Sequence, residues 1–404
     1  MRQGVFRFTL TFVLVAGCGP DPFLTGDEGA GSSNETDPAG VAAFKIFLQE
    51  AKQYAPNLKV FKLVGTTPIP DPWKPVDLPA ASEGGSEEDV PDGDLAHVET
   101  ADGRLFDEIP GARPPRVVKA GAQSFFVDGS KTGGEPPSVV VPAVKTDDGV
   151  GVLQQKQIVS TDNRLRETSI DSRYVVRLQR VGSSSPHCTG TLIGARIVLT
   201  AAHCIDNDGN GTRDANLVVA PGARSASFAG TREPQGARDV IFYQWPRGWS
   251  GGGAKYDYGI LVLRDLAPAA DWSPMVNLIG VRSSSWLRDQ TFYSRGYPGA
   301  TRTCADAAPG DGGLCNGYQY RQHPGLYLHA VYTSYVTHEF DTQPGQSGSG
   351  LYAYTGGNRV VYAVHKGPYG VRNRAHRIRS GSYGLICDTF ADYPSTHYVD
   401  ISCE

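Results

Sequence analysis

The sequence lacks the features that mark several large classes of protein. Its 38 basic and 42 acidic residues give a formal net charge of only −4, which offers no electrostatic footprint for nucleic acid. No internal apolar run is long enough to span a bilayer. There is no Cys-x-x-Cys spacing of the kind that binds zinc, and no internal repeat. Glycine (49) and proline (28) are abundant instead, which favours turn-rich β structure with linkers.

The N-terminus is typical of an exported protein. Arg2 and Arg7 are followed by a short apolar run and then by small residues, which predicts a secretory signal within residues 1–18. Residues 15–18, Val-Ala-Gly-Cys, resemble a bacterial lipobox, in which Cys18 becomes the lipidated first residue. A simple signal peptide with an incidental cysteine is the alternative. We expect export to the bacterial cell envelope or surface, with a lipid anchor or with secretion after processing.

The cysteines support an oxidising compartment. Setting Cys18 aside leaves an even set of six within the last 217 residues, as expected for disulfides in an exported protein. Although the sequence alone allows other pairings, sequence neighbours suggest three disulfides. They are Cys188–Cys204, Cys304–Cys315 and Cys387–Cys403.

Composition divides the rest of the chain in two. Residues 19–157 are rich in Gly, Pro, Ser and acidic side chains, and we interpret them as a tether and a partly disordered pro-region. Residues 158–404 carry many short strand-like segments separated by turn signals, with no long helical period. This predicts an all-β domain of the size of a double barrel.

Three stretches of this domain suit nucleophilic catalysis. Residues 343–350, Gln-Pro-Gly-Gln-Ser-Gly-Ser-Gly, place Ser347 in a loop whose glycines allow tight turns and a close approach of backbone N–H groups. A nucleophilic serine with an oxyanion hole needs such a loop. A Gly/Ser-rich hairpin loop without a catalytic function would have the same sequence pattern. Upstream, a strand pair leads into His203, and Asp257 stands at the mouth of an apolar strand.

Together these stretches resemble the trypsin/chymotrypsin-like serine proteases, and most closely the bacterial glutamyl endopeptidases. The order His, Asp, Ser is that of the chymotrypsin-like enzymes. The histidine motif is residues 199–204, Leu-Thr-Ala-Ala-His-Cys, and the aspartate motif is residues 257–259, Asp-Tyr-Gly. Residues 296–299, Gly-Tyr-Pro-Gly, and the Ser347 loop match the bacillar form. The resemblance covers about residue 158 to the end and implies two antiparallel six-stranded β-barrels with the site between them, and a disulfide matching Cys188–Cys204.

The resemblance also implies roles. Ser347 would be the nucleophile, His203 the general base, Asp257 the partner of the imidazole, and the N–H groups of Gly345 and Ser347 the oxyanion hole. Gln346 stands where trypsins have the aspartate that receives a new N-terminal amine, so this chain should not use that activation switch.

Pocket positions carry two interpretations. Glutamyl endopeptidases bind the acidic side chain with a hydroxyl, a histidine and the mature α-amine, which match Thr342, His365 and Ile158 here. Cleavage after Gln157 would free that amine and make residues 19–157 a pro-region. Asp341, however, lies six residues before Ser347, where trypsins keep the aspartate that binds Lys or Arg.

Residues 206–214, rich in Asp and Asn around glycine, resemble part of a calcium loop, with Asp206, Asp208 and Asn210 as candidate ligands. The twelfth position is Leu217 rather than a glutamate, so a solvated turn is the alternative. Apart from this structural calcium we expect no cofactor. The remaining histidines show no ligand spacing and are interpreted as structural or surface residues: His97, His187, His323, His329, His338, His376 and His397.

The sequence thus predicts a monomeric serine endopeptidase acting on proteins or peptides, with cleavage after Glu or Asp. Its only membrane contact would be a lipid anchor, and nucleic acid is not expected as a partner. Trypsin-like cleavage through Asp341 is one alternative. A catalytically inactive protease-fold binding module is another.

Overall fold

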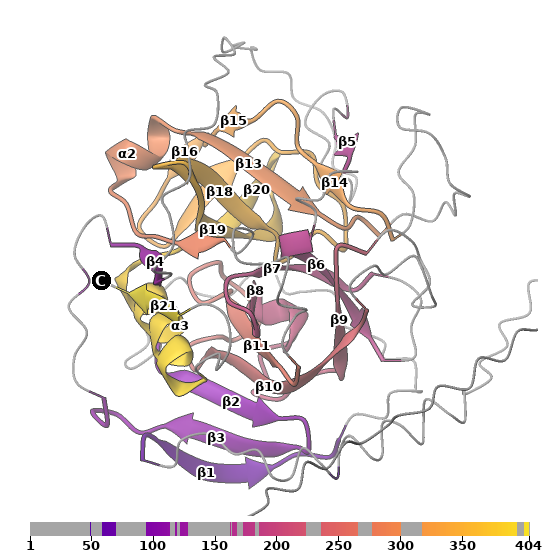
Figure 1. Cartoon of the computed structure of the whole chain (residues 1–404), viewed down its shortest axis with the longest axis vertical. Helices are drawn as coiled ribbons and strands as arrows, with labels where there is room; N and C mark the ends of the chain where they lie inside the picture. Colours follow the sequence, from indigo (N-terminus) through magenta and orange to yellow (C-terminus); the bar gives the residue numbers. More distant parts are fainter. Residues whose placement is uncertain are drawn as a thin grey trace, which may run out of the picture. The chain divides into compact units, whose positions relative to one another are not determined.

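A computed structural model gives the fold of the chain (Figure 1). Two sheets, built almost entirely from antiparallel strands, make up most of the described chain. The structure describes residues 49, 59–69, 94–113, 118, 122–127, 162, 164–167, 173–181, 186–223, 236–265, 277–299, 317–393 and 400–403.

The first sheet contains a closed six-stranded barrel. Its strands follow the cyclic order β10-β11-β8-β7-β6-β9, and pairing of β9 with β10 closes the ring. Side chains of these strands face the barrel interior or neighbouring elements, so β8 and β11 are mostly apolar and every one of their residues is buried. The barrel strands are β6 Val175–Arg180, β7 Cys188–Leu192, β8 Ile197–Thr200, β9 Leu217–Pro221, β10 Arg238–Pro246 and β11 Gly259–Leu263.

Residues assigned to the pro-region extend the same sheet. β2 (Ala96–Thr100) pairs with β10 from Phe242↔Thr100 to Pro246↔Ala96, and β3 (Arg104–Glu108) joins β2 to β1 (Phe61–Thr66). Figure 1 shows β2 running beside β10. The pro-region boundary predicted near residue 157 therefore does not coincide with an edge of the sheet.

The second sheet carries the serine loop. Its strand order is β16-β17-β20-β19-β18-β13-β14-β5, with β12 and β15 joined to β19 and β13, and among the described residues this path does not close on itself. Its strands are β5 Leu165–Arg166, β12 Leu278–Ile279, β13 Thr291–Gly296, β14 Tyr320–Arg321, β15 Leu326–Tyr327, β16 Ala330–Val331, β17 Tyr335–His338, β18 Gly350–Thr355, β19 Asn358–Tyr369 and β20 Arg372–Arg377.

Helices are few in the described chain. η2 (Ala202–Cys204) and α2 (Ser284–Arg288) are short, whereas α3 (Ser380–Asp392) is a full helix that the sequence analysis did not anticipate. The Cys387–Cys403 disulfide ties α3 to β21 (Asp400–Cys403), which pairs with β4 (Ser124–Val127). None of the described helices is long and apolar enough to cross a membrane.

The expected all-β, chymotrypsin-like architecture is confirmed. One antiparallel barrel and a second antiparallel sheet meet through hydrogen bonds between β7 and the serine loop, of which the Thr189 N–H to Ser347 carbonyl bond is one (2.8 Å).

Candidate active site

The histidine and the aspartate meet on the first barrel. η2 directly follows β8 and carries His203, and Asp257 stands two residues before β11, the strand that pairs with β8. His203 Nδ1 lies 2.9 Å from Asp257 Oδ2 and 3.0 Å from Oδ1, and the His203 backbone N–H donates to Oδ1 at 3.0 Å. An ionised carboxylate only accepts hydrogen bonds, so Nδ1 carries the proton and Nε2 is left as a base.

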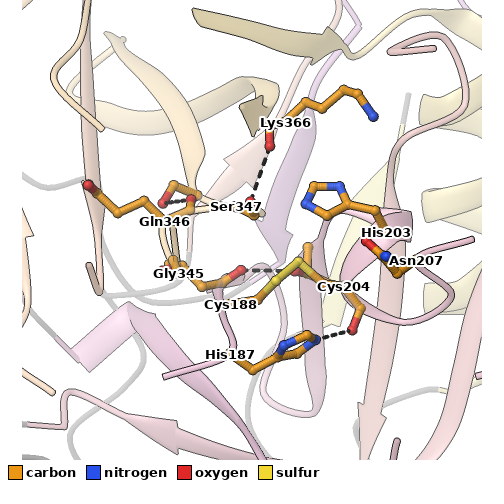
Figure 2. Close-up of a disulfide and its surroundings, with 12 residues drawn as sticks. His187, Cys188, His203, Cys204, Asn207, Gly345, Gln346, Ser347 and Lys366 are labelled. Atoms are coloured by element: carbon orange, nitrogen blue, oxygen red, sulfur yellow. Dashed lines mark hydrogen bonds between the residues drawn. A yellow bond between two sulfur atoms is a disulfide. The ribbon is translucent and has the colours of Figure 1, made fainter. Parts of the chain in front are cut away.

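A disulfide brackets this histidine. The expected Cys188–Cys204 bond is present, with the two Cα atoms 6.1 Å apart, and it ties β7 to η2 (Figure 2). His187 Nε2 lies 3.0 Å from the Cys204 carbonyl. Burial lowers the pKa of His187 to about 3, so its ring is neutral and donates this bond.

The serine loop has the tight turns predicted from its glycines. Gly345 and Gly348 have backbone φ angles of 92° and 84°, a conformation that residues with a side chain rarely adopt. A Cβ on Gly348 would lie 2.2 Å from the Thr189 carbonyl oxygen and 2.2 Å from Thr200 Oγ1. The glycine after Ser347 therefore lets this loop pack against the strands that lead to His203.

Ser347 and His203 face one another in Figure 2, where the imidazole points toward the serine side chain. The Ser347 hydroxyl donates to the Lys366 carbonyl at 3.1 Å. In this arrangement the nucleophile is directed to a carbonyl, and a side-chain rotation is needed before it donates to His203.

Two backbone amides at the serine are available to an anion. In the described part of the chain, no acceptor is found for the N–H groups of Gly345 and Ser347, whereas the intervening Gln346 amide donates to the Gln343 carbonyl at 3.1 Å. The Gly345 carbonyl is held away from the site by the Thr189 hydroxyl at 2.8 Å. Paired free amides beside a serine are the usual form of an oxyanion hole.

Besides His203, Asp257 has a cationic partner that sequence reasoning missed. Lys366 Nζ lies 3.1 Å from Asp257 Oδ2, and the aspartate is fully buried. Burial alone would raise the pKa of Asp257, but the charges of His203 and Lys366 and the hydrogen bonds from His203 outweigh it and hold the pKa below its ordinary value. A lysine just after the apolar run of residues 360–364 gives no signal of this contact in the sequence.

The predicted pocket residues that the structure describes, Thr342, Asp341 and His365, are buried. Thr342 and Asp341 adjoin at the start of the serine loop, and the Asp341 N–H donates to Gln322 Oε1 at 3.0 Å. His365 lies on β19, and its Nδ1 is 3.1 Å from Nε2 of His338 on β17. The sequence analysis interpreted His338 as a structural or surface residue, whereas the structure places it against His365.

The hydrogen bonds assign the tautomers of this histidine pair. The Phe340 N–H donates to His338 Nδ1 at 3.3 Å, so the proton of a neutral His338 lies on Nε2. Nε2–H then donates to His365 Nδ1, which leaves the His365 proton on Nε2. Burial lowers the pKa of both rings, of His365 to about 3, so each is neutral. His365 thus presents an N–H donor on the side of the ring away from His338.

Only part of the predicted N-terminal contribution can be described. Ile158, Gln157 and Cys18 lie outside the described residues. Arg164, six residues after Ile158, donates from Nη1 to Gln346 Oε1 and pairs with Asp162 at 2.6 Å. A cation from this region therefore binds the residue that precedes Ser347.

The candidate calcium loop is closed by its own backbone. Asp206 accepts N–H bonds from Gly209, Asn210 and Gly211 at 2.8–3.1 Å. Oxygens of Asp206, Asp208 and Asp214 lie within 4.8 Å of one another, so Asp214 joins the candidate ligands in the carboxylate cluster. The calcium expectation stays a prediction. Of the remaining cysteines, Cys387 and Cys403 form the expected bond, and Cys304 and Cys315 lie outside the described residues.

Comparison with known proteins agrees with this site. Residues 188–361 match the trypsin-like peptidase domain family, and this range contains His203, Asp257 and Ser347. The expected resemblance to trypsin-like serine peptidases is therefore confirmed for residues 188–361.

Individual relatives are more distant. A glutamyl endopeptidase of Bacillus licheniformis is 28% identical over 201 residues, covering 49% of this chain and 55% of that protein. An extracellular metalloprotease of Bacillus subtilis is 29% identical over 139 residues, covering 33% of this chain and 42% of that protein. The chain spans about half the length of these curated relatives.

Two solved structures are also similar. A Glu endopeptidase in complex with MPD has 21% identity and a TM-score of 0.45, covering 58% of this chain and 99% of that one. The protease Anisep from Arthrobacter nicotinovorans has 19% identity and a TM-score of 0.38, with coverages of 53% and 92%.

Proposed function

We propose that the chain is a serine endopeptidase that cleaves peptide bonds after Glu or Asp. The observation that carries the chemistry is the convergence of His203, Asp257 and Ser347 across the two sheets, beside two backbone amides for which the described residues offer no acceptor. The specificity rests on the N–H donor that the His338–His365 pair presents.

The reaction follows from these contacts. His203 Nε2 takes the proton of Ser347 Oγ as the oxygen bonds to the scissile carbonyl carbon, and the Gly345 and Ser347 amides donate to the oxyanion that forms. Asp257 stabilises the imidazolium. The C–N bond then breaks as His203 protonates the leaving amine. Water, deprotonated by the same histidine, hydrolyses the acyl-enzyme and restores the serine.

An acidic side chain suits the pocket because a buried carboxylate needs strong donors. His365 Nε2–H is one donor, and we propose the Thr342 hydroxyl and the Ile158 amine as the others. The B. licheniformis relative is named as a glutamyl endopeptidase, which supports this choice. Asp341 supports the alternative, because an ionised aspartate at that position would bind Lys or Arg instead.

The name of the B. subtilis relative raises metal-dependent hydrolysis as another chemistry. The group closest to the site that could hold a metal is Cys188, His203 and Cys204. Its two sulfurs are bonded to each other as a disulfide and so offer no thiolate, which leaves His203 alone and means that this donor set does not fit a metal.

A cleavage-site map tests the proposal. Protein processed to Ile158 is incubated with a mixed peptide library, beside a Ser347→Ala control, and the cut bonds are identified by mass spectrometry. Cuts after Glu or Asp that vanish in the control are expected. Cuts after Lys or Arg would assign the pocket to Asp341 and leave the serine chemistry standing. Absence of cuts, together with no labelling by a fluorophosphonate, would favour the inactive binding module.

A further inference from the structure

Lys366 contacts both ends of the proposed catalytic apparatus. Its Nζ lies 3.1 Å from Asp257 Oδ2, and its own carbonyl accepts the Ser347 hydroxyl at 3.1 Å. The side chain is only 8% exposed, and Nζ lies 4.9 Å from the centre of the Trp249 ring. The Trp249 indole is itself fixed by a hydrogen bond from Nε1 to the Asp206 carbonyl. An ammonium held between a carboxylate and an aromatic face has a defined position.

The charges around His203 are few. Asp257 is the anion in contact with its ring, and Lys366 is the cation in contact with Asp257. Among the described residues, the other titratable groups that interact with this pair are three neutral rings, because burial lowers the pKa of each of them to about 3: His187, His365 and His376. Two arginines lie one residue further from the pair. The charge of Arg180 helps to lower the pKa of His187, and the charge of Arg379 helps to lower the pKa of His376.

We propose that Lys366 is a positioning residue whose ammonium opposes a positive charge on His203 and so extends the working range of Ser347 to lower pH. The inference rests on the proposed serine-hydrolase function. A fixed ammonium disfavours a second positive charge on the nearby imidazole, and it offsets part of the carboxylate charge that would stabilise that imidazolium. The same repulsion acts on the imidazolium that forms during catalysis, so Lys366 gives no advantage in rate at alkaline pH.

The direction of the effect follows. Only neutral His203 can accept the serine proton. Without the ammonium, the imidazolium is favoured, and activity is lost at a higher pH as the solution is acidified. We expect the acid limb of the Lys366→Met variant to lie about one pH unit above that of the wild type, which is roughly a tenfold lower rate on that limb.

Fluorophosphonate labelling of Ser347 measures this without reference to the substrate pocket. Second-order labelling rates are recorded between about pH 5 and pH 10 for the wild type, Lys366→Met and Lys366→Arg. The methionine variant should show the shifted acid limb and an alkaline rate equal to or above that of the wild type. The arginine variant should follow the wild type. Coincident profiles, or a uniform loss of rate at every pH, would overturn the proposal, because a merely structural lysine gives the latter.

The controls separate this inference from the proposed function. Ser347→Ala must not label. If the wild type does not label either, the serine chemistry is wrong and the inference fails with it. If the wild type labels and the profiles coincide, the inference fails alone. Circular dichroism checks folding, and Lys366→Gln, which keeps an N–H donor for Asp257 without the charge, replaces the methionine variant if that variant does not fold.

Discussion

Glu99 and Arg213 form a buried ion pair across the predicted boundary between pro-region and protease domain. Arg213 Nη1 lies 2.7 Å from Glu99 Oε1, and the two side chains are 0% and 1% exposed. The guanidinium also donates to the carbonyls of Thr100 and Ala101, and the Arg213 backbone N–H donates to Glu99. β2, the strand that contains Glu99, thus supplies the counter-charge for the Arg213 guanidinium, which is buried next to the barrel.

Replacing Glu99 by Gln should be strongly destabilising, because it leaves Arg213 buried without a counter-charge. We expect a loss of about 3–5 kcal/mol in the free energy of unfolding, measured by denaturant titration. Glu339→Gln is the matched control, since its pair with Arg372 is partly exposed to solvent and its loss should change stability by less than about 1 kcal/mol. Equal effects of the two substitutions would contradict the assignment of Glu99 to the core of the fold.

Cleavage after Gln157 should leave a two-chain protein. β2 keeps its pairing with β10, Asp94 keeps its bonds to Tyr258 and Arg379, and the Glu99–Arg213 pair stays buried. We expect the N-terminal fragment to co-elute with the protease domain in size-exclusion chromatography and to separate in denaturant. Separation under native conditions would show that the strand pairing does not hold the fragments together.

Arg164 should support the oxyanion hole through Gln346. Arg164→Met removes one of the two hydrogen bonds that hold Gln346 Oε1, the other being from the Gln343 N–H, and so loosens the residue between the two candidate oxyanion amides. This should lower kcat about tenfold and change KM little. Arg166→Met provides the control, because Arg166 instead stacks on Tyr318 at 3.7 Å. The measurement is steady-state kinetics of both variants on one peptide. An equal loss of kcat in the two variants would argue against this contact.

His338 should set specificity without touching the nucleophile. His338→Phe removes the donor to His365 Nδ1, so the His365 proton is no longer directed to Nε2. We expect kcat/KM for a Glu peptide to fall roughly tenfold to a hundredfold, from the loss of one buried hydrogen bond, while fluorophosphonate labelling is unchanged. His329→Phe, at an exposed position, should alter neither rate. Unchanged Glu turnover in the first variant would remove the histidine pair from the pocket.

Buried neutral histidines should make the fold sensitive to acid. Burial lowers the pKa of His376 to about 3 from 6.5, so below pH 6.5 the unfolded chain binds a proton that the folded chain does not. Stability is therefore lost as pH falls from 6.5 toward 3, by about 2 kcal/mol at pH 5 for this group.

The comparison with His376→Phe isolates this effect. The substitution keeps an aromatic ring against Tyr258, which stacks on His376 with ring centres 4.5 Å apart. Raised pKa values of Asp206 and Asp214, caused by burial, act in the opposite direction, but they are common to both proteins and cancel in the difference. Thermal unfolding at pH 7 and pH 5 should show a smaller loss in the variant. An equal loss would mean that His376 takes up its proton in the folded state.

The parts of the fold that could be predicted depended on local sequence. Apolar β-branched segments predicted the strands, and the glycines around Ser347 predicted its turns. The features that were missed depend on tertiary contacts. Lys366 resembles an ordinary solvated lysine until docking of the two sheets brings it to Asp257, and His338 and His365 are distant in sequence. In α3, Gly381 and Gly384 weaken the helical signal, which burial and the Cys387–Cys403 bond offset.

The contact between Lys366 and Asp257 joins elements from different sheets. His203 and Asp257 belong to the barrel, whereas Ser347 and Lys366 belong to the second sheet. A chain in which only one sheet has folded therefore has either a base without a nucleophile or a nucleophile without a base. Such folding intermediates cannot hydrolyse their neighbours, so proteolytic competence would appear only once the two halves have docked, and it would disappear as soon as they separate.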